Sequence, residues 1–332
     1  MKAIVYNKYG GTDQLKYLDV EKPKIVRNQV LVKVHAACIN QADVYLLNGK
    51  PLPIRFISGF FKPKSKILGA NISGVIEQIG EGVSNFKVGD EVFGELEATQ
   101  NGGFAEYILI KPNQITLKPS NTSHITAASL PMVGFTALQG LRLANVKEGS
   151  NILIYGASGG VGTAMIQIAK ALKANVTAVC STRNIEVAKA SNADKIIDYT
   201  KEQWDKDNIK YDAVIGCNGY NHLTRYRDAL KDNGTYVVSG GHMKQIMQVT
   251  THKPFMRKKG NKQFKTYVAK IVKSDINTLA ELLKNKEIVP YIDKIFNLDE
   301  TKDAFDYFLS NKAIGKIAIQ IFPVNTRNRK EV

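Results

Sequence analysis

The pattern of apolar and polar positions changes once along the chain, at about residue 126. Before that point, short apolar runs alternate with turn residues, as in QVLVKVHAA at 29–37 and FAEYILI at 104–110. Apolar runs of this length between turn signals are typical of antiparallel strands. We therefore expect a β-rich domain over residues 1–125, with a hairpin at the glycines of 80–89.

After residue 126, strand-like apolar runs alternate with helix-like segments. The pattern predicts helices over 127–143, 161–174 and 184–190, and strands near residues 152, 176, 196, 213 and 236. Alternation with short links is typical of a parallel sheet that helices cover on both faces. We expect an α/β fold with a doubly wound parallel sheet over 126–276. Residues 277–332 predict a helix from about 278, a strand at 289–293, a helix over 301–309 and a strand at 316–321, returning to the first domain.

The sequence NILIYGASGGVG at 151–162 joins an apolar strand to a helix through a glycine-rich turn. Glycine is needed where a turn has positive dihedrals, or where a side chain would hold the backbone away from a bound pyrophosphate. The helix that follows presents unpaired N–H groups and the positive end of its dipole. The segment predicts a dinucleotide site made of Gly156, Ser158, Gly159, Gly160, Val161 and Gly162.

The end of the second strand of this domain indicates which dinucleotide binds. Folds that select NAD place an acidic residue on the adenosine ribose roughly 20 residues after the glycines. This chain has Ser181, Thr182 and Arg183 there instead. Hydroxyl and guanidinium groups bind a 2′-phosphate, which a carboxylate would repel. We expect NADPH as the cofactor, with Ser181 and Arg183 as binding residues. The alternative is that Arg183 is a solvated cation.

Length and composition are those of a globular protein with two domains: 332 residues, of which 44% are hydrophobic and 23% charged. No apolar run is long enough to cross a bilayer, and the amino terminus lacks the apolar core of a signal peptide. We expect a cytoplasmic protein without a membrane partner. The three cysteines, Cys38, Cys180 and Cys217, are far apart, which favours small buried side chains over disulfides.

Two further segments have more than one interpretation. The formal net charge is +16, and residues 253–273 hold eight Lys or Arg without one acid. Such a run is either a solvated face or a nucleic-acid contact, and no stacked aromatic pattern accompanies it. Residues 50–66, with Pro51, Pro53 and Pro63, predict a long irregular loop of the kind that covers a substrate pocket.

Several motifs of the chain resemble one family over nearly the whole length. They are AACINQAD at 36–43, GANISGVIEQIG at 69–80, AASLPMVGFTAL at 127–138, GASGGVG at 156–162 and GKIAI at 315–319. In these motifs the chain resembles the medium-chain dehydrogenase/reductase superfamily, in its zinc-independent quinone oxidoreductase-like branch. The resemblance implies a GroES-like domain joined to a Rossmann domain, an active site between them, and a homodimer.

The resemblance also assigns residues. It implies that Asn40 reaches the nicotinamide or the substrate oxygen, that Tyr45 is a donor or proton relay, and that Asp43 fixes nearby backbone groups. The alternative for the N-x-x-D pattern is a helix cap. The resemblance also implies that Thr136 contacts the nicotinamide, while Tyr199 and Lys316 lie near the adenosine and cofactor phosphates. Asn218, Gly240 and Gly241 follow sheet strands, where open α/β sheets bind ligands.

The same comparison predicts that no metal is bound. Zinc-dependent relatives have Cys at the position of Asn40 and a His–Glu pair at the positions of Ala70 and Asn71, and no Cys lies between 93 and 107. An amide and an alanine do not replace zinc ligands. Two positions depart from the branch, which commonly has Asp where this chain has Asn71 and Gly216.

We therefore expect an NADPH-dependent enzyme that reduces an electron-poor small molecule, a quinone or an α,β-unsaturated carbonyl compound. One alternative is an enoyl-type reductase for a single metabolite. The other is a nucleotide-sensing or RNA-binding protein that has kept the cofactor fold and uses the basic run at 253–273.

Overall fold

The computed structural model describes residues 1–97, 100, 102–206, 209–241, 243–256 and 260–322. The chain divides into two compact units: residues 1–132, 271–284 and 292–332 form the first, and residues 133–270 and 285–291 form the second. Compact units and domains are defined differently, so the domain limits expected after residues 125 and 276 stay a prediction.

A seven-stranded sheet organises the first unit. Its order is β14-β15-β3-β4-β5-β7, and β6 pairs with β3. All pairs are antiparallel except the parallel pair of β14 and β15, so the β-rich domain expected from the apolar runs is confirmed. A separate antiparallel pair joins β1 to β2. The strands are β1 (Lys2–Val5), β2 (Lys16–Asp19), β3 (Val30–Ile39), β4 (Asn71–Ile79), β5 (Glu91–Glu95), β6 (Tyr107–Ile110), β7 (Ile115–Leu117), β14 (Ile292–Asn297) and β15 (Lys316–Gln320).

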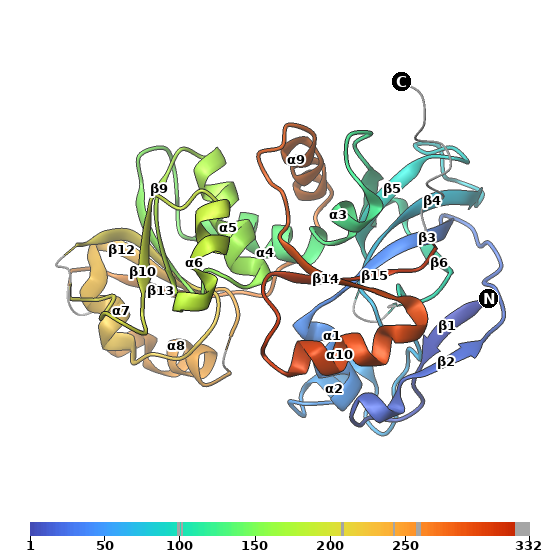
Figure 1. The fold of residues 1–332 in the computed structure, drawn as a ribbon, viewed down its shortest axis with the longest axis horizontal. Coiled ribbons are helices and arrows are strands. Elements are labelled where there is room, and N and C mark those ends of the chain that lie inside the picture. Colours follow the sequence, from blue (N-terminus) through green and yellow to red (C-terminus); the bar gives the residue numbers. More distant parts are fainter. Residues whose placement is uncertain (98–99, 101, 207–208, 242, 257–259, 323–332) are drawn as a thin grey trace. The chain divides into compact units, whose positions relative to one another are not determined.

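Helices cover both sides of this sheet (Figure 1). On one side α1 (Gln41–Asn48), α2 (Ile54–Ser58) and α10 (Thr301–Leu309) lie together, and on the other side are α3 (His124–Ala128) and α9 (Lys273–Lys284). Helices α1 and α10 share an apolar core with β3 and β15, in which Leu47 and Phe305 are buried. A second core, which includes Val32, Ile72 and Val92, fills the space between β3, β4 and β5.

The second unit contains a six-stranded sheet in the order β10-β9-β8-β11-β12-β13. Every pairing in it is parallel, as the alternation of strands and helices predicted. The chain order reverses between β8 and β11, and this is the point at which open parallel sheets bind ligands. The strands are β8 (Asn151–Tyr155), β9 (Asn175–Cys180), β10 (Lys195–Asp198), β11 (Tyr211–Gly216), β12 (Leu230–Val238) and β13 (Gln263–Thr266).

Right-handed crossovers place α5 and α6 on one face of this sheet and α7 and α8 on the other (Figure 1). The aromatic rings of Trp204, Tyr226, Tyr236 and Phe264 are buried in the core under α7 and α8. The helices of the second unit are α4 (Pro131–Leu143), α5 (Gly160–Ala171), α6 (Ile185–Ala190), α7 (Leu223–Ala229) and α8 (Met243–Met256). Short 3₁₀ turns are η1 (Thr12–Gln14), η2 (Pro112–Gln114), η3 (Thr182–Asn184) and η4 (Leu298–Glu300).

Four local predictions were wrong. The helix expected over 127–143 is two helices, α3 and α4, because Pro131 has no N–H and begins a new helix. The helix expected from 278 begins at Lys273, and the strand expected at 289–293 begins at Ile292. The loop expected at 50–66 contains the short helix α2. Helix α8 was not predicted. None of the described helices is long and apolar enough to cross a membrane.

Candidate active site

The three glycines of the turn between β8 and α5 are needed for different reasons. Gly156 has φ +79°, and a Cβ added there would lie 2.6 Å from the amide nitrogen of Asn218. A Cβ on Gly162 would lie 2.5 Å from the carbonyl oxygen of Gly156, so Gly162 allows the helix to start against the turn. A Cβ on Gly159 would meet no atom within 4 Å. Gly159 therefore faces open space, where a ligand could approach the backbone.

Helix α5 begins beside this open space. Gly159 is the N-cap residue and its backbone is extended, with φ −77° and ψ 169°. Because glycine has no capping side chain, no N-cap side chain binds the first N–H groups of the helix, which include those of Gly160 and Val161. The positive end of the helix dipole favours an anion there. The turn therefore fits the pyrophosphate of a dinucleotide.

The ends of β8, β11 and β12 converge at the same place. A Cβ on Gly241, which has φ +88°, would lie 2.8 Å from Cα of Asn218. A Cβ on Gly240 would lie 3.1 Å from the Cys217 carbonyl oxygen. The structure thus brings Gly156, Asn218, Gly240 and Gly241 together at the carboxyl ends of neighbouring strands. Asn218 is exposed, so its side chain is accessible to a ligand at this edge.

Asn184 joins the glycine turn to the end of β9. Its amide nitrogen donates to Oγ of Ser158 at 2.9 Å and to Oγ of Ser181 at 3.1 Å. Asn184 is buried, and its Oδ1 has no hydrogen-bond partner among the described residues. The two predicted cofactor residues Ser158 and Ser181 therefore lie close together, and the exposed Arg183 follows on η3. The sequence analysis missed Asn184, for which the chain gives no distinctive motif.

Tyr199 lies at the rim of a pocket of about 270 Å³ in the second unit. Its ring is 49% exposed, and its centroid is 6.2 Å from that of Tyr155. Trp204 and Arg225 also line the pocket, and Arg225 is held by a two-point ion pair with Asp205. Tyr199 is therefore on a ligand-accessible surface, and its contact with the cofactor stays a prediction.

Thr136 is linked to the end of β12 through Tyr267. The Tyr267 hydroxyl donates to the backbone carbonyl of Thr136 and lies 3.1 Å from Oγ of Ser239. Ser239 directly precedes Gly240. A Cβ on Gly140 would lie 2.5 Å from the Tyr267 hydroxyl oxygen, so glycine is required beside this link. The sequence analysis missed Tyr267, because nothing local connects it to Thr136.

In the first unit, Asn40 and Lys316 form the centre of a buried polar cluster. The Lys316 ammonium donates to Oδ1 of Asn40 at 2.6 Å and to the Ile39 carbonyl at 3.1 Å. The Asn40 amide nitrogen donates to the Cys38 carbonyl at 3.1 Å. Both side chains are almost fully buried. The amide of Asn40 therefore has a single orientation, with its oxygen fixed by a cation.

Asp43 fixes the backbone around this cluster. Its carboxylate accepts from the backbone N–H of Asn40 at 2.8 Å and of Gly69 at 3.0 Å. Burial raises the pKa of Asp43 to about 6, although these hydrogen bonds and Lys316 act in the opposite direction. The contact with the Asn40 N–H is the helix cap that the alternative predicted, because Asn40 is the N-cap residue of α1 and Asp43 is its third residue. The contact with Gly69 fixes a second backbone segment, and a part in catalysis stays a prediction. Tyr45 is half-buried on α1.

Lys316 was expected near the cofactor phosphates. Its ammonium group donates to the Ile39 carbonyl and to Asn40, which directly precede α1, and a place near the phosphates stays a prediction. The antiparallel register explains this position, because Ile317 on β15 is opposite Ile39 on β3. The sequence could not reveal the pairing, since the two strands are far apart along the chain.

Two further polar residues next to this cluster lack partners. Asn71 is fully buried, and neither Nδ2 nor Oδ1 has a hydrogen-bond partner among the described residues. Its register partners are Cys38 on β3 and Glu95 on β5. Oε2 of Glu95 is likewise buried without a partner in that part of the chain. Burial, reinforced by the nearby Asp43, raises the pKa of Glu95 to about 8, so Glu95 holds a proton at neutral pH.

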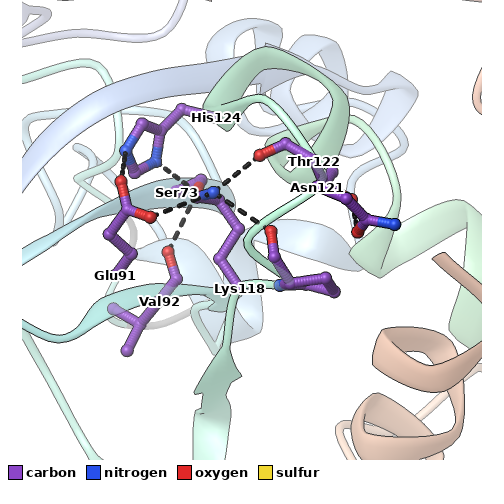
Figure 2. A network of polar contacts seen from close by, with 8 residues as sticks. Ser73, Glu91, Val92, Lys118, Asn121, Thr122 and His124 are labelled. Carbon is purple, nitrogen blue, oxygen red and sulfur yellow. Dashed lines mark hydrogen bonds and ion pairs between the residues drawn. The ribbon is translucent and has the colours of Figure 1, made fainter. Parts of the chain in front are cut away.

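A second polar network lies on the same sheet, and its groups are paired (Figure 2). The buried Lys118 ammonium donates to the Thr122 carbonyl at 2.6 Å and forms an ion pair with Glu91 at 3.1 Å. His124 contacts Glu91 through Nε2 and Ser73 through Nδ1. Figure 2 shows these side chains converging from β4, β5, the first residue of α3 and the segment before α3.

The ring of His124 also stacks on His35, with centroids 4.6 Å apart. Burial lowers the pKa of His124 to about 4, and the neighbouring His35 and Lys118 add to this by opposing a positive charge on the ring. Burial also lowers the pKa of His35. Both rings are therefore neutral at pH 7. The sequence analysis treated the histidines as isolated residues and missed this pair.

The remaining candidates are the cysteines, the possible metal ligands and the basic run at 253–273. The three cysteines are free and buried, as expected. No group of three or more His, Cys, Asp or Glu within the described ranges could hold a metal ion. In the basic run, residues 257–259 are outside the described residues. The Lys262 and Lys265 ammonium groups donate to backbone carbonyls of Arg227 and Leu143. Nucleic-acid binding by this run stays a prediction.

A parallel sheet with a glycine turn at its switch point, attached to an antiparallel unit with a buried polar cluster, defines a dinucleotide-dependent oxidoreductase. Family models agree: residues 26–120 match the alcohol dehydrogenase GroES-like domain, and residues 192–319 match a zinc-binding dehydrogenase domain.

Individual relatives narrow this class. The chain is 32% identical over 336 residues to 2-methylene-furan-3-one reductase of Solanum lycopersicum, covering 97% of this chain and 80% of that protein. It is 30% identical over 333 residues to a chloroplast envelope quinone oxidoreductase homolog of Arabidopsis thaliana, covering 96% and 98%. The structure of a quinone oxidoreductase from Coxiella burnetii matches with a TM-score of 0.86 at 30% identity, covering 97% and 99%. The chain belongs to the quinone oxidoreductase-like branch of the medium-chain dehydrogenase/reductase superfamily.

Proposed function

We propose that this protein is a reductase that uses NADPH and transfers hydride, without zinc, to quinones or α,β-unsaturated carbonyl compounds. The observation that carries the proposal is the open backbone at Gly159, at the start of α5 and at the switch point of the sheet. Relatives support the acceptor class: besides the two above, an NADPH-dependent alkenal/one oxidoreductase of Arabidopsis thaliana is 31% identical over 97% of this chain and 80% of its own length.

The residues of the second unit fit the cofactor. Its phosphates would lie at the turn from Gly159 to Gly162, where the helix dipole and free N–H groups favour an anion. Ser181 and Arg183 would hold the 2′-phosphate, because that strand end has no acid. Bound NADPH supplies the hydride.

The first unit supplies the polar groups that we propose for catalysis. Reduction of a quinone or enone places negative charge on an oxygen, and fixed donors and cations stabilise such charge best when water is excluded. Lys316 is a buried cation, and it holds Asn40 in one orientation. Glu95 holds a proton at neutral pH. We propose Asn40 and Tyr45 as the groups that contact the substrate, and Lys316 as a positioning residue.

Zinc independence is part of the proposal. Asn40, Ala70 and Asn71 stand at the three positions where the resemblance places zinc ligands, and Lys316 donates to Asn40. An ammonium group beside the first position opposes binding of a divalent cation. Turnover that persists after dialysis against a chelator is the expected result, and loss of turnover restored by zinc would contradict it.

The first test is to follow NADPH oxidation at the reduced nicotinamide band with a panel of quinones and enals, using Gly159→Val. Because a Cβ added at Gly159 has no atom within 4 Å, we expect unchanged thermal stability and NADPH affinity at least about tenfold lower. Gly162→Ala is the matched control, since its Cβ would clash within the protein and lower stability. Unchanged NADPH affinity in Gly159→Val would exclude this turn as the cofactor site.

NADPH preference has its own test. We expect Arg183→Ala to lower NADPH affinity about tenfold and to leave NADH affinity unchanged, since only NADPH has the 2′-phosphate. Lys189→Ala, an exposed cation on the neighbouring helix α6, is the control. An unchanged ratio of the two affinities in Arg183→Ala would show that Arg183 does not bind the 2′-phosphate.

We also propose a homodimer and a cytoplasmic location. Strand β13 is the last strand of the six-stranded sheet, and an edge strand supports pairing with a second chain. Light scattering tests the homodimer, and cell fractionation tests the location.

A further inference from the structure

The segment 50–66 displays large apolar side chains on the surface of the first unit. Phe61 is 90% exposed and Phe56 is 72% exposed. Leu52, Ile57 and Phe60 are also exposed, each by about half or more. The Phe60 ring contacts the rings of both Phe56 and Phe61, at centroid distances of 5.8 and 5.1 Å. These three rings therefore form one continuous apolar surface, called the Phe patch here, rather than scattered residues.

The local structure holds the Phe patch outward. The Tyr9 hydroxyl binds Oγ of Ser58 at 2.8 Å and the Gly59 carbonyl, which anchors the end of α2. Gly59 has φ +115°, and the Lys64 N–H donates to the Ser58 carbonyl at 2.8 Å, which closes a turn. Phe60 and Phe61 lie at the tip of this closed turn. These hydrogen bonds fix the backbone that carries the rings, so the place of the Phe patch at the surface is a property of the fold.

The segment that carries the Phe patch is also basic. Lys50, Arg55, Lys62, Lys64 and Lys66 all lie within the segment, which contains no Asp or Glu. Arg55 is held over the Tyr9 ring at 4.5 Å. The formal charge of the whole chain is +16. Apolar rings bordered by cations are complementary to a surface that is anionic outside and apolar beneath.

We propose that the Phe patch is a docking site for an anionic lipid bilayer. Phe side chains enter the boundary between headgroups and acyl chains, and Lys and Arg remain at the anionic headgroups. The cations distinguish this partner from an uncharged apolar protein surface. This attachment is peripheral, in agreement with the finding that no described helix could cross a membrane. It departs from the expectation of no membrane partner, which rested only on the lengths of apolar runs.

The proposal does not rest on the proposed reductase activity. Attachment to a bilayer would, however, bring such an enzyme close to quinones with long apolar tails, because those quinones reside in bilayers. Binding to vesicles is measured without cofactor or substrate, so failure of either proposal leaves the other intact.

The test is sedimentation of the full chain with vesicles of phosphatidylcholine alone or with about one third phosphatidylglycerol. We expect binding to the anionic vesicles that weakens with added salt, and little binding to the neutral vesicles. Phe60→Ser with Phe61→Ser is expected to weaken binding about tenfold or more. Lys62→Glu with Lys64→Glu is expected to weaken it at least about 20-fold, since each basic residue contributes about fivefold.

A matched control is Lys87→Glu with Val88→Ser, which changes an exposed cation and an exposed apolar residue in a distant turn. Melting temperatures should remain unchanged for all variants, because the replaced side chains are exposed. The proposal is overturned if wild type does not sediment with anionic vesicles, or if the double Phe variant binds as well as wild type. It is also overturned if that variant changes only the mass in solution or the KM for a soluble quinone, which would make the Phe patch a contact between copies or a cover for the substrate pocket.

A second readout reports insertion directly. The chain has a single tryptophan, Trp204, which is buried in the second unit and gives a constant background. In Phe61→Trp the new indole is expected to shift its emission to shorter wavelength when anionic vesicles are added, as it leaves water. An emission maximum that vesicles leave unchanged would contradict the proposal even if the protein sediments.

Discussion

Glu91 and Glu95 belong to the same strand, face the same side of the sheet and have opposite properties. Glu91 forms an ion pair with Lys118 and a hydrogen bond with the neutral His124 ring. Burial acts to raise the pKa of Glu91, but the contacts with Lys118 and His124 outweigh it and lower that pKa. Glu95 has an unpartnered buried oxygen, and burial raises its pKa to about 8. The network of Glu91 satisfies its polar groups and stabilises the sheet. The cluster of Asn71 and Glu95 leaves polar groups unpaired, which costs stability and is typical of a site that awaits a ligand.

Replacing the two buried lysines is expected to give the largest difference between the network of Glu91 and the cluster of Glu95. Lys316→Met removes the donor that fixes Asn40, and we expect kcat/KM for quinone or enone reduction to fall about 100-fold. Lys118→Met is the matched variant, because its ammonium group is buried and bonded to carbonyls in the same way. We expect Lys118→Met to lower the free energy of unfolding by about 2–3 kcal/mol and to leave kcat/KM unchanged.

For Lys316→Met, stability must be measured alongside activity, and kcat and KM must be determined separately. Urea unfolding shows whether lost activity reflects lost folding, and separate kcat and KM values show whether binding or turnover is affected. Equal losses of kcat/KM in Lys316→Met and Lys118→Met would remove the distinction between the two networks.

The carboxylates provide the next prediction, through the pH dependence of stability. The pKa of Glu95 is higher in the folded protein than in the unfolded chain. The stability that protonated Glu95 contributes is therefore present below the pKa of the unfolded chain, and it is lost as pH rises through about 8. We therefore expect Glu95→Gln to be more stable than wild type by about 2 kcal/mol at pH 9, with a smaller difference at pH 6. Denaturant unfolding at both pH values measures this.

Glu91→Gln is the control for that experiment, with the opposite sign. The pKa of Glu91 is lower in the folded protein than in the unfolded chain. The stability that ionised Glu91 contributes is therefore present above the pKa of the unfolded chain, and it is lost as pH falls through the pKa of the folded protein. We expect Glu91→Gln to be less stable than wild type at neutral pH. A Glu95→Gln variant whose stability follows wild type from pH 6 to pH 9 would disprove the raised pKa.

The smallest effect is expected from the histidine pair. The pKa of His124 is lowered to about 4, so the unfolded chain binds more protons and stability falls as pH drops from about 6.5 to 4. Between these pH values, we expect the free energy of unfolding of His124→Gln to fall by about 1 kcal/mol less than that of wild type. Thermal unfolding at pH 7 and pH 5 tests this, with the exposed His222→Gln as control. The same loss in His124→Gln and wild type would show that the pair does not titrate with unfolding.

Many features of the fold could be predicted because they depend on neighbouring residues. Apolar periodicity located most strands of both sheets, although β13 was not predicted and β14 begins later than expected. The spacing of Gly156, Gly159 and Gly162 predicted the turn into α5. Helix boundaries were less predictable where a proline intervened, as at Pro131, or where polar residues filled a helix, as in α8. Motifs also identified Asn40 and Asp43 as a unit, and their hydrogen bond forms within one helical turn.

The sequence by itself determined the class of fold, the glycine turn and the absence of an acid at the end of β9, because each follows from residues that are adjacent along the chain. Tertiary structure decided which polar groups are paired. Lys316 bonds to Asn40, His35 stacks on His124, and Glu95 is left without the cations that Glu91 has. These outcomes depend on strand register and burial, and the pKa of a carboxyl or imidazole group responds to its surroundings in space rather than to its neighbours in sequence.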